Sequence, residues 1–351
     1  TSWHRDAMLV RDNLTYTVTP PGRSIQLKEN VMSKQTITVI KGDGIGPSII
    51  DSALEILNAV GCDYEYEFVD AGLAALEKTG ELLLFRPEEN AKRLNRSATR
   101  MGMPTLPVEV FMEGLKTLVD LDRAWVPNVE DSALYLRPFM FANDEFIGVK
   151  KASNYHFIIF TCPVGPYYSA PVSVWIEKDF KRAFPGGTGA AKAAGNYAAT
   201  LYPASLANDN GYDQILWTDG LESKYVEEIG TMNVFFIIDG KALTPELDGT
   251  ILEGITRESV IQLLKGKGVE VEERKVSIAE ILEAHKAGLL QEVFGVGTAA
   301  TITHISALGY GEVHYDLPPI ADRKISLSAR EELVNIKLGL AADEHGWIVR
   351  I

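Results

Sequence analysis

The chain has 351 residues, of which 46% are hydrophobic, and it carries a formal net charge of −14. A chain of this length can bury a large core and is expected to form two or three domains. The acidic charge argues against nucleic acid and anionic membranes as principal partners, because both require clustered Lys and Arg.

Cysteine and histidine usage indicates neither a metal site nor an oxidising compartment. The two cysteines, Cys62 and Cys162, form no Cys-x-x-Cys pair, and so few thiols fit a reducing environment. No apolar run approaches the roughly 20 residues that span a bilayer, and the first residues contain no signal-peptide core. We therefore expect a cytoplasmic protein without a metal. Six histidines show no metal-ligand spacing: His4, His156, His285, His304, His314 and His345.

The sequence pattern divides the first 83 residues into two segments, 1–31 and 32–83. Residues 1–31 are polar, and residues 36–40 form an apolar, β-branched run that is typical of a buried strand. Pro47 is placed to open a helix that ends near residue 60. Residues 64–69 alternate as a strand does. The order strand, helix, strand suits a parallel sheet.

Helical and strand-like patterns then follow one another to the end of the chain. Before the Pro- and Gly-rich connection at 163–168, we expect helices at 88–101 and 108–126 and strands at 133–142 and 156–162. After it, we expect a strand at 172–176, a helix at 197–208, strands at 214–218, 224–229 and 234–238, helices at 257–264 and 278–287, a strand at 292–295 and a helix at 328–340. The expected segments are therefore 1–31, 32–83, 84–165 and 172–351.

Three runs of sequence carry the chemistry. The first is Gly186-Gly187-Thr188-Gly189-Ala190-Ala191-Lys192-Ala193-Ala194-Gly195-Asn196-Tyr197, whose small residues leave room for a bulky group bonded to the lysine amine. The others are Glu227-Glu228-Ile229-Gly230-Thr231-Met232-Asn233 and Phe294-Gly295-Val296-Gly297-Thr298-Ala299-Ala300. Together they resemble the pyridoxal-phosphate site of the branched-chain aminotransferases, and the resemblance covers about residues 84–351.

This resemblance implies a two-domain enzyme of fold type IV, with α/β and α+β architecture. Residues 84–165 would form part of the small domain, and residues 172–351 would form the large domain that binds pyridoxal 5′-phosphate. The implied reaction transfers the amino group of leucine, isoleucine or valine to 2-oxoglutarate, giving branched 2-oxo acids and glutamate. A homodimer is implied as well.

The resemblance also assigns cofactor residues. Lys192 matches the catalytic lysine that bonds the cofactor and then moves the substrate's α-proton. Glu228 would face the pyridine nitrogen, whereas its neighbour Glu227 would point to the other face of the strand. The remaining positions that match cofactor-binding residues are Arg93, Tyr197, Thr231, Ile255, Thr256 and Thr298. Of these, Arg93, Thr298 and the helix start at Ile255–Thr256 would hold the phosphate, since a helix N-terminus offers free N–H groups.

Substrate recognition is assigned to the run Tyr135-Leu136-Arg137-Pro138, which resembles the family's Tyr-x-Arg-Pro strand. Arg137 would bind the distal carboxylate of glutamate or 2-oxoglutarate, because its planar fork matches a carboxylate. Tyr135 and the backbone N–H groups of Thr298 and Ala299 would bind the α-carboxylate. The alternative for Arg137 is an ordinary surface salt bridge.

Residues 32–83 depart from this family. The run Ile37-Thr38-Val39-Ile40-Lys41-Gly42-Asp43-Gly44-Ile45-Gly46-Pro47 resembles the N-terminus of isocitrate and isopropylmalate dehydrogenases, so the chain looks chimeric. The rest of that dehydrogenase family is missing, since we find no Arg-rich substrate loop and no paired metal-binding aspartates. Residues 42–46 match neither the GxGxxG fingerprint nor a P-loop. A dehydrogenase activity is therefore the least expected.

Two other readings remain open. The chain could be another fold type IV enzyme, such as a D-amino-acid aminotransferase or an aminodeoxychorismate lyase. The Tyr135–Pro138 strand and the run Gly346-Trp347-Ile348-Val349 disfavour that reading. It could also be a chimeric chain that binds pyridoxal phosphate without turnover.

Overall fold

The computed structural model describes the backbone of residues 8–11, 14–17, 35–39 and 64–68, and describes residues 81–127, 132–165 and 170–351 with their side chains. The chain divides into two compact units, Thr1–Ala75 and Leu76–Ile351. Among the described residues, no helix is both long and apolar enough to cross a membrane.

The first unit contains two pairs of strands. β1 (Met8–Arg11) pairs with β2 (Leu14–Thr17) in antiparallel fashion. β3 (Gln35–Val39) and β4 (Tyr64–Phe68) pair in parallel, with Gln35 opposite Tyr64. The strands expected at 36–40 and 64–69 are therefore confirmed, together with their parallel arrangement. The helix expected after Pro47 lies outside the described residues.

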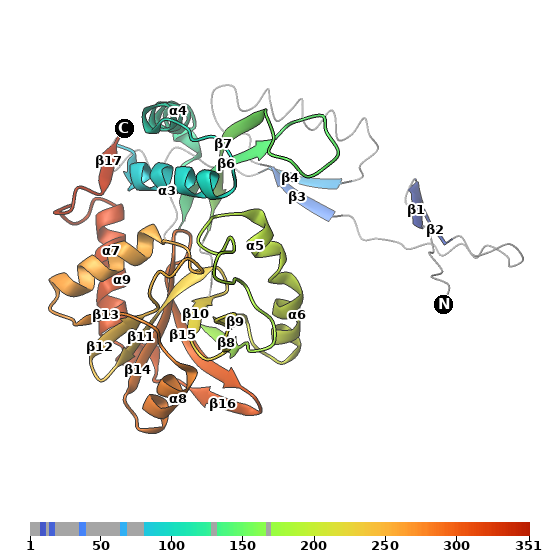
Figure 1. The fold of residues 1–351 in the computed structure, drawn as a ribbon. Coiled ribbons are helices and arrows are strands. Elements are labelled where there is room, and N and C mark those ends of the chain that lie inside the picture. The colour runs from blue at the N-terminus through green and yellow to red at the C-terminus, as the bar shows by residue number, and fades with distance from the viewer. Residues whose placement is uncertain are drawn as a thin grey trace, which may run out of the picture. The chain divides into compact units, whose positions relative to one another are not determined.

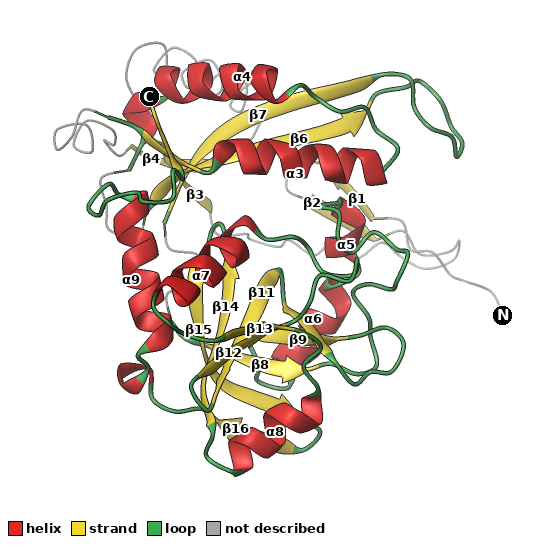
Figure 2. Ribbon diagram, turned by 60° about the vertical axis from the view of Figure 1, so that its left-hand side comes forward, coloured by secondary structure: helices red, strands yellow, loops and turns green. Residues whose placement is uncertain are grey.

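The centre of the second unit is a nine-stranded sheet (Figures 1 and 2). Its strands are hydrogen-bonded in the order β10-β9-β8-β15-β14-β11-β12-β13, and β16 adds to β15. Because β10 also pairs with β11, six of these strands close into a ring. The strands are β8 (Val172–Ile176), β9 (Gln214–Thr218), β10 (Val226–Ile229), β11 (Met232–Ile238), β12 (Lys241–Thr244), β13 (Val271–Glu273), β14 (Leu290–Gly297), β15 (Thr301–Tyr310) and β16 (Val313–Asp316).

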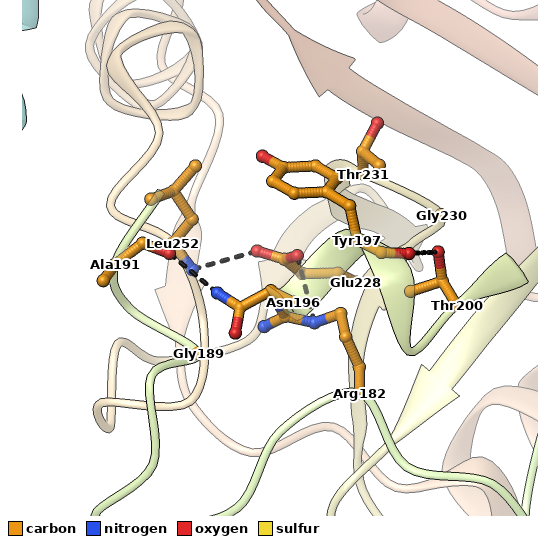
Figure 3. Close-up of a pocket in the computed structure, with 10 residues that line it drawn as sticks. All are labelled: Arg182, Gly189, Ala191, Asn196, Tyr197, Thr200, Glu228, Gly230, Thr231 and Leu252. Atoms are coloured by element: carbon orange, nitrogen blue, oxygen red, sulfur yellow. Dashed lines mark hydrogen bonds and ion pairs between the residues drawn. The ribbon is translucent and has the colours of Figure 1, made fainter. Parts of the chain in front are cut away.

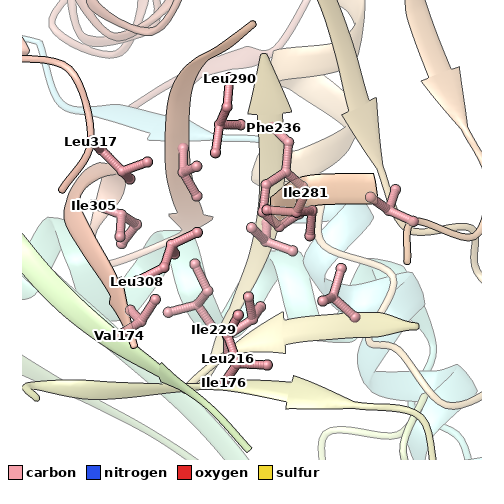
Figure 4. Close-up of a cluster of buried hydrophobic side chains, with 14 of the residues drawn as sticks. Val174, Ile176, Leu216, Ile229, Phe236, Ile281, Leu290, Ile305, Leu308 and Leu317 are labelled. Atoms are coloured by element: carbon pink, nitrogen blue, oxygen red, sulfur yellow. The ribbon is translucent and has the colours of Figure 1, made fainter. Parts of the chain in front are cut away.

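Hydrophobic side chains cover both faces of this sheet. Successive residues of a strand point to opposite faces, so β11 sends Phe236 into one core and Phe235 into the other, and both are fully buried. The first core, drawn in Figure 4, includes Ile281 of α8 (Ile278–Lys286). The second core is covered by α7 (Ile255–Gly266) and α9 (Ile325–Lys337).

A smaller layer lies at one end of this sheet (Figure 2). In it, a third core packs α3 (Pro87–Arg100) and α4 (Val108–Leu121) against the antiparallel pair β6 (Ala133–Ala142) and β7 (Tyr155–Val164). β17 (Ile348–Arg350) returns to pair with β5 (Leu83–Phe85), so the C-terminal strand belongs to the same layer. The chain leaves α4 through a short 3-10 turn, Arg123–Trp125, and a second such turn, Ile320–Asp322, precedes α9.

The helix expected at 197–208 is interrupted. The structure has α5 (Ala194–Ala198) and α6 (Leu201–Asp209) in its place. Proline lacks an N–H group and its ring collides with the carbonyl four residues earlier, so it is tolerated only in the first turn of a helix. Pro203 occupies the first turn of α6 and therefore requires a new helix to begin near residue 201.

Several strands have no counterpart in the sequence-based expectation. The sequence does not predict β5, β12, β13, β15, β16 or β17, and the strand expected at 292–295 extends over 290–297. β15 is central, with β8 and β14 as neighbours, but its sequence interleaves Thr, His, Ser and Gly with its apolar residues. It therefore contains neither a continuous apolar run nor a strict alternation.

The last helix begins at Ile325 rather than near residue 328. The carboxylate of Glu292, on β14, accepts hydrogen bonds from the backbone N–H groups of Lys324, Ile325 and Ser326 at 2.8–3.0 Å. The first N–H groups of a helix have no partner within it and need such an acceptor. The cap comes from a residue more than 30 positions away, so local sequence does not reveal this start.

We expect Glu292→Ala to lower the free energy of unfolding by about 2–3 kcal/mol, because three N–H groups lose their acceptor at a buried site. Urea unfolding measures this change. Glu283→Ala is the matched control, since Glu283 is exposed on α8, and it should change stability by about 0.5 kcal/mol or less. Equal losses in the two variants would contradict the capping role.

His304 on β15 makes stability depend on acid pH. Burial and, to a smaller extent, the charge of Arg323 lower the pKa of His304 to about 4, although Glu292 opposes the shift. The ordinary pKa is 6.5, so between these values the unfolded chain binds a proton that the folded chain rejects. Stability is therefore expected to fall by about 2 kcal/mol as pH drops from 6.5 to 4. In urea unfolding across this range, His304→Gln should reduce the dependence, whereas His345→Gln, at an exposed position, should keep it.

Candidate active site

Lys192 lies on the loop that leads into α5, and its side chain is exposed. Its amine lies 3.0 Å from the phenol oxygen of Tyr197, one turn further along. Its backbone N–H donates to Ser97 Oγ at 2.9 Å. Two carbonyls of the same loop, those of Gly186 and Gly187, accept from the guanidinium of Arg100. Ser97 and Arg100 belong to α3, so this helix holds the lysine loop in place.

Asn196 fixes the shape of this loop from inside. It is buried, its amide donates to the carbonyl oxygens of Thr188 and Ala191 at 2.8 Å, and its Oδ1 accepts from the hydroxyl of Thr188. These bonds connect the residues before Lys192 with Asn196, which follows it, and so hold the backbone of the loop in place around the lysine.

The carboxylate of Glu228, on β10, forms one wall of the cavity shown in Figure 3. Its Oε1 accepts from the N–H of Leu252 at 3.0 Å and from the amide of Asn233 at 3.3 Å. Its Oε2 lies 3.3 Å from Nε of Arg182, which is also buried. Burial raises the pKa of Glu228, and Arg182 opposes the shift. Tyr197 and Thr231 line the same cavity.

Glu227 lies on the other side of the strand, as alternation requires. It is buried too, but it lines a separate cavity, and its Oε1 lies 2.7 Å from the hydroxyl oxygen of Thr250. Only Glu228 shares a cavity with Tyr197.

Arg93 of α3 lies against the loop that enters α7. Its guanidinium donates to the carbonyl of Glu253 at 3.4 Å and to Asn90 Oδ1 at 3.0 Å. Burial lowers the pKa of Arg93, and the phenols of Tyr197 and Tyr135 are close enough to oppose this shift. The arginine therefore lies near both Tyr197 of α5 and Tyr135 of β6.

Ile255 and Thr256 are buried at the first two positions of α7, where the backbone N–H groups have no acceptor within the helix. Gly254 is the N-cap residue of this helix, and a Cβ atom there would lie 2.0 Å from Asn233 Oδ1. A larger residue at 254 would therefore displace the asparagine that contacts Glu228.

Thr298 and Ala299 are exposed in the turn between β14 and β15. Thr301, which ends this turn, has a φ of 53°, a conformation that is uncommon for a β-branched residue. Its hydroxyl accepts a hydrogen bond from Lys337 at 3.0 Å, and burial lowers the pKa of Lys337 to about 8.

Tyr135 and Arg137 lie two residues apart on β6 and contact each other, with the guanidinium 4.9 Å from the ring centre. Arg137 is exposed, and no carboxylate among the described residues forms an ion pair with it. The alternative of a surface salt bridge is therefore not seen in the described part of the chain.

Sequence reasoning missed the residues that hold the site together. Arg182 and Asn233 contact Glu228, and Ser97 and Arg100 hold the lysine loop. Buried asparagines and arginines carry no local signal of their partners, although the short spacing from Glu228 to Asn233 suggests a hairpin contact. Within the described residues, no cluster of His, Cys, Asp and Glu could hold a metal ion.

Comparison with known proteins agrees with this geometry. Residues 78–308 match the family Amino-transferase class IV. The chain is 47% identical over 282 residues to a probable branched-chain-amino-acid aminotransferase of Staphylococcus aureus, with 79% of each chain covered. It resembles the crystal structure of a branched-chain aminotransferase from Thermoproteus uzoniensis with norvaline, with a TM-score of 0.66 and 28% identity over 78% of this chain and 86% of that chain.

A further solved relative was determined with its cofactor. It is the pyridoxal-phosphate form of the branched-chain aminotransferase from Thermobaculum terrenum, with a TM-score of 0.62 and 26% identity over 77% of this chain and 84% of that chain. The family match covers well over half of the chain, and the identity to the Staphylococcus aureus relative is high. The chain therefore belongs to the class IV aminotransferases and, within them, to the branched-chain-amino-acid aminotransferases of fold type IV.

Proposed function

We propose that the protein transfers the amino group of leucine, isoleucine or valine to 2-oxoglutarate, with pyridoxal 5′-phosphate as cofactor and Lys192 as the catalytic residue. The products are the branched 2-oxo acids and glutamate. The observation that carries this proposal is the 3.0 Å hydrogen bond between the exposed Lys192 amine and Tyr197. Tyr197 and the buried Glu228 line the same cavity.

The donor set fits this cofactor. When bound, pyridoxal phosphate supplies an aldehyde that bonds to amines and a ring that accepts electrons. An exposed amine, a buried carboxylate and a buried arginine beside a helix N-terminus match its aldehyde, ring nitrogen and phosphate in turn. We assign cofactor binding to Arg93, Lys192, Tyr197, Glu228, Thr231, Ile255, Thr256 and Thr298.

Each of these residues has a physical task. Lys192 takes the α-proton of the substrate and returns it, and Tyr197 holds the amine in position by its hydrogen bond. Arg182 stabilises the ionised form of Glu228, which favours a protonated ring nitrogen. Arg93 and the first N–H groups of α7 bind the phosphate dianion, which the helix dipole favours.

For the substrate we assign Tyr135, Arg137, Thr298 and Ala299. Tyr135 is close enough to Arg93 to affect its pKa, so this part of β6 borders the proposed phosphate site. Arg137 has an unpaired guanidinium among the described residues, and its fork suits the distal carboxylate of 2-oxoglutarate. The backbone N–H groups of Thr298 and Ala299 lie in an exposed turn and suit the α-carboxylate.

We further propose a cytoplasmic homodimer. The loop between β6 and β7 exposes three large apolar side chains, namely Phe146 at 55%, Ile147 at 102% and Val149 at 109% of their full accessible areas. Clustered exposed apolar residues mark interaction surfaces, and a second copy of the chain would cover them.

For the organisation of the chain, we propose segments 1–31, 32–83, 84–165 and 172–351, with the dehydrogenase-like segment 32–83 joined to the aminotransferase part. The parallel pairing of β3 with β4 supports the parallel sheet expected in this segment.

The visible absorption of the purified protein tests the proposed function. With pyridoxal phosphate it should turn yellow, and L-leucine should convert this band to the pyridoxamine form. Lys192→Ala should lose at least about a thousandfold in turnover, because both the covalent attachment and the proton transfer depend on the amine. Lys224→Ala, at an exposed lysine of the same domain, should behave like the parent protein.

Other results would refute the proposal. A yellow band that L-leucine leaves unchanged would mean cofactor binding without turnover. Turnover of D-alanine but not of L-leucine would favour a D-amino-acid aminotransferase, and isocitrate-dependent reduction of NAD(P) would favour the dehydrogenase.

Arg137→Gln should separate the two half-reactions. The loss of a charged hydrogen bond, worth roughly 1.5–3 kcal/mol, is expected to raise the KM for 2-oxoglutarate about tenfold to a hundredfold. The half-reaction with leucine, whose side chain carries no carboxylate, should change far less. Steady-state kinetics with each substrate varied measures both; an equal loss in the two would contradict the assignment.

A further inference from the structure

Behind Glu228 lies a second group of buried and half-buried polar side chains. Thr250 Oγ1 lies 2.7 Å from Glu227 Oε1 and 2.6 Å from Asp248 Oδ1, so one hydroxyl stands between two carboxyl groups. Asp248 Oδ1 also accepts the backbone N–H of Thr250 at 3.0 Å. Thr250 has 1% of its surface exposed and Glu227 has 4%, whereas Asp248 is exposed.

The single hydroxyl hydrogen of Thr250 cannot account for both of its short contacts, one to Glu227 and one to Asp248. A threonine hydroxyl has a single hydrogen and can donate once. If both carboxyl groups were ionised, one of the two contacts, at 2.6 or 2.7 Å, would join two oxygens with no hydrogen between them. One carboxyl must therefore carry a proton and donate it to Thr250 Oγ1.

Burial identifies which carboxyl carries that proton. Asp248 is exposed and accepts from the Thr250 backbone, as an ionised carboxylate does. Glu227 is buried, and its second oxygen, Oε2, has no hydrogen-bond partner among the described residues. A buried carboxylate oxygen without a partner costs far more than the carbonyl oxygen of a neutral acid. Burial accordingly raises the pKa of Glu227.

The charges around Glu227 favour the same answer. Among the described residues, Arg182 is the cation whose side chain is buried beside the two glutamates, and its Nε lies 3.3 Å from Glu228 Oε2. Lys181, which also interacts with Glu227, is only half-buried. Two ionised glutamates would leave one buried negative charge without a partner. Four of the remaining charged groups that line the cavity of Glu227 are acidic and oppose a further negative charge, namely Asp219, Glu222, Glu246 and Asp248, whereas Lys275 favours one.

We propose that Glu227 is a neutral carboxylic acid in the folded protein at neutral pH, that its Oε1 donates its proton to Thr250 Oγ1, and that Thr250 donates in turn to Asp248. Arg182 then forms its ion pair with Glu228 alone. Glu227 is thus a positioning residue, because its neutrality reserves the guanidinium for the carboxylate that faces the cofactor. This last consequence rests on the role of Glu228 proposed above.

Infrared spectroscopy tests the proton directly on the full-length protein. The parent protein at neutral pH should show the C=O stretching band of a protonated carboxyl, which shifts in D2O and upon labelling with 13C-glutamate. Glu227→Gln, which keeps the shape of the neutral acid, should abolish this band. The exposed control Glu222→Gln should retain it. Absence of the band from the parent protein, or its persistence in Glu227→Gln, would overturn the proposal.

Asp248→Asn tests the hydrogen-bond chain. Without the Asp248 charge, the Thr250 hydroxyl is released to donate to Glu227, so the midpoint pH of the infrared band should fall by at least one unit. Asp248 is exposed, so the variant should fold. An unchanged midpoint would contradict the arrangement through Thr250.

The dissociation constant of pyridoxal phosphate, measured by absorbance titration, separates this proposal from the assignment of Glu228. Glu227→Gln should bind the cofactor within about twofold of the parent protein, because it replaces one neutral group by another. A change of more than fivefold would mean that Glu227 was charged and would overturn the proposal. If Glu228→Gln also binds normally, the role of Glu228 fails, whereas the protonation of Glu227 is still decided by the infrared band.

Discussion

The buried ion pair between Arg182 and Glu228 is the constraint on which the rest of the site depends. Arg182 also donates to the carbonyl of Thr250, and Glu228 accepts from the N–H of Leu252. Both contacts fix the loop that enters α7, and therefore the helix end proposed to bind the phosphate. A buried pair of this kind is costly unless its geometry and its other hydrogen bonds are satisfied. A buried ion pair at this position is suited to a function that requires an ionised carboxylate shielded from water.

The shortage of buried positive charge also bears on how two adjacent glutamates, Glu227 and Glu228, can both be buried on β10. Two adjacent glutamates on a strand point to opposite faces, and both faces of β10 are buried. The guanidinium of Arg182 is close enough to affect the pKa of Glu227 and forms its ion pair with Glu228, so it can neutralise one carboxylate. When Glu227 is neutral, Arg182 pairs with Glu228 alone, and this pairing favours the ionised form of Glu228.

Helix α3 connects this chemistry with the smaller layer of the second unit. Through Ser97 and Arg100 it holds the lysine loop, and through Arg93 it reaches the loop before α7. A single helix thus relates the proposed Schiff-base lysine to the proposed phosphate site. Displacement of α3 would alter both at once, because neither the lysine loop nor the α7 entrance has a regular element of its own at these contacts.

Local sequence determined the family, the lysine run and most elements of the large sheet, because glycine-rich runs and apolar β-branched strands carry their signal within a few residues. The strands at 133–142, 172–176 and 214–218 were predicted to the residue. Tertiary structure decided what depends on distant partners. Glu292 sets the start of α9 from a neighbouring strand, β15 is a strand because β8 and β14 flank it, and Arg182 meets Glu228 across 46 positions. Hydrogen bonds and ion pairs between remote residues leave no periodic pattern in the sequence, so only the folded structure shows which polar groups are paired.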